Sequence, residues 1–174
     1  MFSPRNQLKV FGQYAQYRYV DVVLQPNDFD PQSVGGAWLH VLEDGKSTLF
    51  GSFYHGLEKD VSTIVTIPAT PDGGRVDGAK NFNGFRVGGQ TTYGDRTTYF
   101  ASAGLQVGEY SKENYWFQQQ RSDRFYDLTV GANWRWDKLL TLRPQLNYSK
   151  NNSNIVIYAY NRIDVSLNIR RDFR

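Results

Sequence analysis

Residues of alternating polarity recur along almost the whole of this 174-residue chain, and this period of two constrains its fold more than any other feature. In the segment 125–136, Tyr126, Leu128 and Val130 fall on one side of an extended chain, with Asp127 and Thr129 on the other. A helix would instead bring together residues three and four apart, and that period is nearly absent. The sequence therefore predicts an all-β fold.

Eight strands are expected, joined by connections that alternate in length. The tight turns are "EDGKS" at 43–47, "GDR" at 94–96 and "DK" at 137–138. The long polar stretches are 20–34, 58–80 and 111–123, and "NNSNIVIY" is intermediate. If the strands form an up-and-down meander, every tight turn lies at one end and every longer loop at the other. Outer-membrane barrels have this asymmetry, with short periplasmic turns and long extracellular loops.

The N-terminal third is less regular than the rest. In "QLKVFGQYAQYRY" the alternation changes phase near Tyr14, which predicts a β-bulge. Ala37 and Leu39 are expected on the apolar face of their strand, with Trp38 and His40 on the polar face.

Composition fits one barrel domain spanning residues 1–174, which is either a whole barrel or the C-terminal part of a larger one. Aromatic residues make up 16% of the chain, which favours strands, and there is no Cys for a disulfide or thiolate metal site. The net charge of +3 is scattered and forms no basic block, so no nucleic-acid partner is predicted. The mean hydropathy of -0.58 does not argue against a membrane barrel, because half of each strand faces the lumen.

The apolar faces carry aromatic side chains near the strand ends and a charge-free band of aliphatic and small residues between them. Tyr and Trp favour the membrane–water boundary, so the aromatic residues are expected to form two girdles around a lipid-facing band. The predicted interface aromatics are Phe85, Tyr93, Tyr99, Tyr126, Trp134, Trp136, Tyr148 and Phe173. The fold expected is an eight-stranded antiparallel transmembrane β-barrel in the bacterial outer membrane, in contact with its lipids.

The opposite faces are rich in polar and charged residues and are expected to line the lumen. Five Arg against three Asp leave a small positive excess. In an eight-stranded barrel these side chains would form a plug, whereas in about 16 strands they would line a channel with mild anion preference. The predicted lumen-lining residues are Arg86, Gln90, Asp127, Asn133, Arg135, Arg143, Gln145, Asn147, Arg162, Asp164, Asn168 and Arg170.

The C-terminal segment carries two resemblances. The alternating strand that ends in Phe173 resembles the signal by which outer-membrane proteins are recognised by their insertion machinery, although Arg174 follows the aromatic residue here. "SNI", the step from Tyr158 to Tyr160, Arg162 and the final "RRDF" resemble the closing hairpin of barrels in the surface lipoprotein assembly modifier family. That resemblance implies a translocator for a surface-directed cargo protein, although no tetratricopeptide repeats are present.

Two other readings of the pattern remain open. A plugged small barrel would have a structural or surface-interaction role, and a soluble lipocalin-like barrel would turn its apolar face inward around a ligand. No catalytic residue, metal site or cofactor is predicted. Ser52 and His55 point to opposite faces of a strand, and His40 and His55 lack a carboxylate constellation that would complete a metal site.

Overall fold

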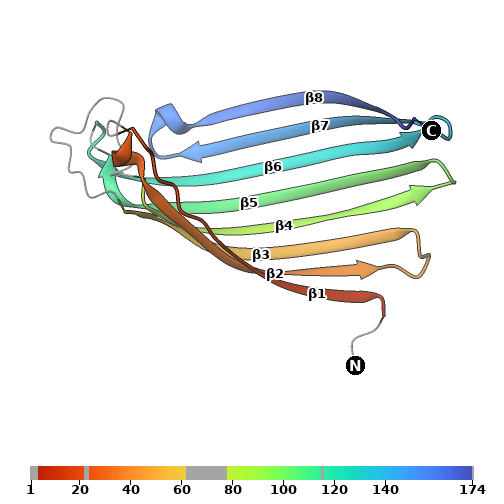
Figure 1. Ribbon diagram of the computed structural model, residues 1–174, viewed down its shortest axis with the longest axis horizontal. Helices are drawn as coiled ribbons and strands as arrows, with labels where there is room; N and C mark the ends of the chain where they lie inside the picture. Colours follow the sequence, from red (N-terminus) through yellow and green to blue (C-terminus); the bar gives the residue numbers. More distant parts are fainter. Residues whose placement is uncertain (1–3, 22–23, 62–77, 115, 174) are drawn as a thin grey trace.

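The computed structural model describes residues 4–21, 24–61, 78–114 and 116–173, and it is a single eight-stranded antiparallel sheet (Figure 1). The strands follow one another in sequence order, so the predicted all-β meander is confirmed. They are β1 (Asn6–Tyr14), β2 (Phe29–Val41), β3 (Ser47–Asp60), β4 (Lys80–Tyr93), β5 (Thr97–Asn114), β6 (Gln119–Arg135), β7 (Leu140–Ser153) and β8 (Tyr160–Arg171). Two short 3-10 turns, η1 (Gln25–Asn27) and η3 (Val156–Tyr158), lie in the connections.

The ladder of paired strands starts at β1 and ends at β8, and in the described part of the chain these two edge strands do not pair with each other. Figure 1 shows β1 and β8 at opposite margins of the curved sheet. Closure into a barrel is therefore not part of this structure and stays a prediction.

The three tight turns lie together at one end of the sheet and the longer connections at the other (Figure 1). Gly45 and Gly94 adopt φ values of 63° and 59°, which glycine reaches without a Cβ clash, and they close the β2–β3 and β4–β5 turns. In the β6–β7 turn the carboxylate of Asp137 accepts hydrogen bonds from the backbone N–H groups of Leu139 and Leu140, with N···O distances of 2.6 and 2.8 Å.

The strands extend further into the predicted loops than the sequence suggested. β5 and β6 contain 18 and 17 residues, and they remain paired up to Asn114 and Gln119. The stretch 111–123 is therefore mostly a hairpin and not an irregular loop. The sequence did not indicate this, because the strand residues beyond the apolar band are polar on both faces and show no alternation of polarity. Likewise β2 begins at Phe29, inside the stretch 20–34.

The β-bulge predicted near Tyr14 is wrong. β1 keeps one register with β2 from Asn6 to Tyr14, and the isolated bridge between Tyr17 and Phe29 continues the same register. The irregularity in register lies instead between Glu109 and Glu113 of β5.

Candidate functional site: the polar face of the sheet

Residues that pair across neighbouring strands share one face of the sheet, so the register assigns every strand residue to a face. The polar face is the one that holds Arg86, Asp127 and Arg143; the aliphatic face holds Leu128, Val130 and Leu167. The register links all twelve residues predicted to line the lumen to the polar face.

Side chains from alternate strands meet over the polar face. The Tyr54 hydroxyl on β3 donates to Oε1 of Gln106 on β5 at 2.8 Å. The Arg86 guanidinium on β4 lies 2.6 Å from the Asp127 carboxylate on β6. Contacts across an intervening strand require the side chains to converge, so the polar face is the concave one.

A trough of about 460 Å³ crosses the polar face from β2 to β7, nearer the tight turns than the longer loops. Its lining includes Leu39 and Phe50 on one side and Arg143 and Gln145 on the other, with Phe100 between them. The Arg143 guanidinium stacks over the Phe100 ring, 4.8 Å from its centroid. We call this hollow the central trough.

The predicted arginines differ in their partners. Arg162 on β8 pairs with Asp164 at 2.7 Å, and Arg170 pairs with Asp172, just after the end of β8, at 2.9 Å. Arg135 donates to the backbone oxygen of Asp95. The charges on this face are therefore largely neutralised within the wall, while Arg143 keeps a cationic group in the central trough.

Aromatic rings on the polar face lie against glycines of the next strand, a feature that sequence analysis missed. A Cβ built on Gly88 would lie 2.5 Å from Cζ of Phe50, and one built on Gly56 would overlap the Phe82 ring. The same relation joins Phe100 to Gly131. The spacing of polar-face glycines opposite aromatic residues was the available signal, but it requires the strand register to be known.

A second polar cluster lies where β5 and β6 approach the longer loops. Arg121 pairs with Asp123 at 2.5 Å, and its guanidinium lies 3.4 Å from the ring centroid of Tyr158 and 4.5 Å from that of Tyr110. Ile155, the buried apolar residue of the described chain, lies one residue before η3, which carries Tyr158. This loop-end cluster is a locally packed cap with paired charges.

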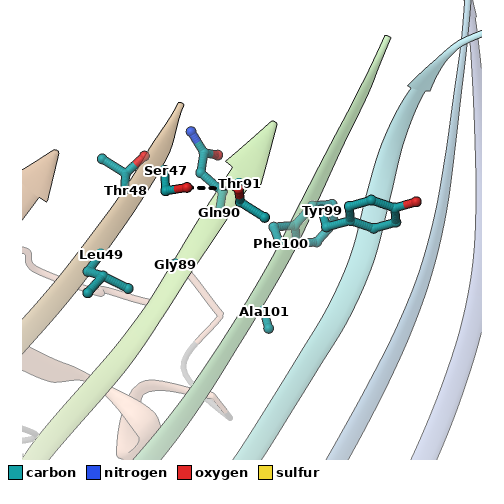
Figure 2. Close-up of a pocket in the computed structure, with 9 residues that line it drawn as sticks. All are labelled: Ser47, Thr48, Leu49, Gly89, Gln90, Thr91, Tyr99, Phe100 and Ala101. Carbon is teal, nitrogen blue, oxygen red and sulfur yellow. Dashed lines mark hydrogen bonds between the residues drawn. The ribbon is translucent and has the colours of Figure 1, made fainter. Parts of the chain in front are cut away.

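The aliphatic face is exposed along the sheet. Leu128 is 45% exposed and Leu167 59%, and Val87, Val130 and Leu146 are exposed as well. Of the eight predicted interface aromatics, Tyr148 is half-buried and the other seven are exposed. A hollow of about 350 Å³ is lined by residues that include Leu49, Gly89, Tyr99 and Ala101. Figure 2 shows these residues, with the hydrogen bond between Ser47 and Thr91, which is 2.8 Å long, beside them.

The face assignment predicted for β2 is wrong. Ala37 pairs with Ser52 and so lies on the polar face, whereas Trp38 lies on the aliphatic face. Trp38 donates its indole N–H to Oδ1 of Asn6 at 3.0 Å, and its ring stacks 5.6 Å from that of His40. Because β2 carries apolar residues on both faces, polarity alone could not decide its orientation. Phe53, also on the aliphatic face, is a further exposed aromatic residue outside the predicted set.

Each histidine ring lies beside an amide group. His40 Nδ1 lies 2.9 Å from Asn6 and His55 Nδ1 3.0 Å from Asn83, both amide partners. The register places Ser52 and His55 on opposite faces. Over the described ranges, no group of three or more His, Cys, Asp or Glu residues could hold a metal ion. Nor does any helix in those ranges have the length and apolarity to cross a membrane.

No protein-family model matches the chain, and neither a curated protein nor a solved structure is similar to it at a level that indicates relationship. The likeness of its last hairpin to the surface lipoprotein assembly modifier family stays a prediction.

Proposed function

We propose that this chain forms the wall of a bacterial outer-membrane β-barrel, or part of that wall, with its aliphatic face in lipid and its polar face lining the lumen. The observation that carries the proposal is the near absence of a protein core. Among the described residues, Ile155 is the single apolar residue whose side chain is buried. Leu128, Val130 and Leu167 are exposed. A single-layer sheet with an exposed apolar face is stable where hydrocarbon covers that face.

The arrangement of connections and aromatic residues supports the same proposal. The tight turns share one end of the sheet, as periplasmic turns do in outer-membrane barrels. Trp134 and Trp136 lie at that end, 4.8 Å apart between ring centroids. Phe85 and Tyr126 lie near the middle of β4 and β6, on the other side of the aliphatic residues Val130 and Leu128. An amphipathic ring is favoured at each membrane–water boundary.

Within this proposal, the lumen acts as a passage for a solute or a surface-directed cargo. The ion pairs and glycine-backed rings hold their side chains against the wall, and the central trough remains open between β2 and β7. A plugged barrel would need these groups to meet across the lumen. Arg143 gives the passage a weak anion preference.

A soluble ligand-binding barrel is less well supported. It would require aliphatic side chains on the concave side and charges on the convex side. Here the side chains that converge on the concave side are those of Arg86, Asp127, Tyr54 and Gln106.

Planar-bilayer recording tests the proposal directly. The chain is refolded in detergent, reconstituted and examined for stepwise ionic current, with a heat-denatured sample as control. Stable current is the expected result. A chain that floats with lipid vesicles yet carries no current would favour the plugged barrel. A chain that folds in buffer without detergent and does not float with vesicles would contradict the membrane assignment.

A further inference from the structure

The aliphatic face does not stay apolar up to the loop ends of β6 and β7. Beyond Tyr126 and Tyr148, the next residues on this face toward the longer loops are Arg124 on β6 and Lys150 on β7. The register places Lys150 opposite Tyr126 and Arg124 one step further along, so the two cations are diagonal neighbours on adjacent strands. Both residues are exposed. At this end, the apolar band is therefore followed by two adjacent positive charges.

These two cations differ from the charged residues of the polar face at the same end of the sheet. On the polar face, Arg121 pairs with Asp123. Among the described residues, neither Arg124 nor Lys150 forms an ion pair. Within the described parts of β6, β7 and β8, the aliphatic face carries no carboxylate. Glu109 on β5 lies at this end of the same face, which leaves one positive charge in excess.

The depth of Arg124 matches the boundary of a membrane. From Trp134 to Tyr126, the aliphatic face of β6 carries no charged residue. That step of eight residues extends about 27 Å along the strand, or about 21 Å along the membrane normal at a tilt of about 40°. Arg124 lies about 5 Å further along the normal, at the edge of the roughly 25 Å apolar band of an outer-membrane barrel. Lipid head groups begin at this depth.

We propose that Arg124 and Lys150 bind the phosphate of an anionic membrane lipid at the loop end of the sheet. This inference rests on the proposed function, because it needs the aliphatic face to lie in lipid. A guanidinium binds phosphate through two parallel N–H···O bonds, and an ammonium adds a point charge. The amide of Asn152 lies opposite Arg124 and that of Asn161 opposite Lys150, so further N–H donors flank the pair.

The position of the pair selects a lipid phosphate over a soluble anion. A lipid held by its phosphate at Arg124 and Lys150 extends its acyl chains along the apolar residues below them, Tyr126 and Leu128. The head group and the chains are then both in contact with the same strand, as the depth of the charges requires. A soluble anion would gain nothing from the apolar band.

A fluorophore at the site measures its lipid preference. The chain contains no cysteine, so Leu128→Cys can be labelled alone, and lipids with brominated acyl chains quench the label when they lie against it. Quenching is compared in vesicles of brominated phosphatidylglycerol with plain phosphatidylcholine and in vesicles with the bromine on the phosphatidylcholine. The reference position is Val87→Cys on β4, at the same level of the ladder but below the uncharged Asn83.

The label at residue 128 is expected to show a preference for phosphatidylglycerol of about fivefold, the factor for one cation near an anionic membrane surface. The label at residue 87 is expected to show a smaller preference. In the variant Arg124→Gln/Lys150→Gln, the preference at residue 128 should fall close to one. The matched control, Lys9→Gln/Arg162→Gln, removes an arginine and a lysine from the polar face and should retain the preference.

Equal quenching by the two lipids at residue 128, or an unchanged preference in Arg124→Gln/Lys150→Gln, would overturn the head-group site. A measurement without these charge substitutions covers the case in which that variant fails to fold: in about 1 M salt the screening length falls to about 3 Å, so the preference at residue 128 should decrease. A preference independent of salt would also overturn the site. Absence of quenching by either lipid would contradict the membrane assignment itself, so the two failures are distinguishable.

Discussion

The guanidinium of Arg86 on β4 and the carboxylate of Asp127 on β6 lie 2.6 Å apart. This ion pair links the two strands directly over Gly104 of β5, the strand between them. A Cβ on residue 104 would come within 2.5 Å of the Asp127 carboxylate and 2.9 Å of the Arg86 guanidinium. The glycine thus leaves the space in which the ion pair forms. The pair is partly exposed, with 40% of the Arg86 side chain and 17% of that of Asp127 accessible, so its contribution to stability is modest.

Asp127→Asn is expected to lower the free energy of unfolding by about 1 kcal/mol, because the Arg86 charge loses its partner. A double-mutant cycle with Arg86→Gln isolates the pair, with unfolding by urea in detergent micelles as the measurement. The expected coupling is about 1 kcal/mol, stabilising. Additive effects of the two substitutions would mean that the ion pair contributes nothing to the fold.

Gly88→Ala is expected to destabilise the sheet by about 1–3 kcal/mol, because the added methyl overpacks a filled site. The new Cβ would lie 2.5 Å from the Phe50 ring and 2.6 Å from the backbone oxygen of Ala101, and a backbone atom cannot move aside alone. The matched control is Gly108→Ala on the same face, where a Cβ would have its nearest neighbours at 3.9 Å. Equal urea midpoints for the two variants would contradict a steric role for Gly88.

Asp137 makes the stability of the β6–β7 turn dependent on pH. The backbone N–H groups of Leu139 and then Leu140 hold the pKa of its carboxyl below the usual range. A carboxyl whose pKa is lower in the folded than in the unfolded state stabilises the fold above the unfolded pKa, about 3.9, and loses that effect as the pH falls through the folded pKa. Asp137→Asn is therefore expected to be less stable than the natural chain at pH 7. The difference should shrink toward zero in acid, measured by urea titration at several pH values; a difference independent of pH contradicts the linkage.

The strands and turns were predictable because their signals are local. Period two marks each strand, and Gly45 and Gly94 mark turns that need a positive φ. The polar face of the last five strands was predictable for the same reason, since Asp127 and Arg143 sit within strictly alternating segments.

The features that could not be predicted from the sequence depend on the strand register or on residues that are distant in the chain. Trp38 lies on the aliphatic face, where Asn6, 32 residues away, accepts a hydrogen bond from its indole N–H. The pairing of Phe100 with Gly131 follows from the β5–β6 register, which sequence alone does not give. The extensions of β5 and β6 into polar sequence are held by backbone pairing, for which residue type is a weak guide.

Ion selectivity should depend on Arg143, which stacks on Phe100 in the central trough. Arg143→Glu changes the charge there by two units, so the weak anion preference proposed for the lumen is expected to become a cation preference. The measurement is the reversal potential across a bilayer under a KCl gradient. The control is Lys46→Glu, the same change of charge in the β2–β3 turn, which should move the reversal potential less. Equal shifts from both variants would indicate that the trough does not line the conducting path.

Leu128 and Thr129 are adjacent on β6 and lie on opposite faces, so they form a matched pair for testing which face meets lipid. Arginine on the lipid face near the membrane midplane costs about 2–4 kcal/mol, whereas a lumen position tolerates charge. Leu128→Arg is expected to reduce insertion into lipid vesicles strongly, and Thr129→Arg only slightly, as measured by flotation and by resistance to heat unfolding. In a water-exposed sheet, Leu128 at 45% exposure would accept arginine within about 0.5 kcal/mol. If Thr129→Arg is the more damaging substitution, the aliphatic face does not contact lipid and the barrel orientation proposed here is wrong.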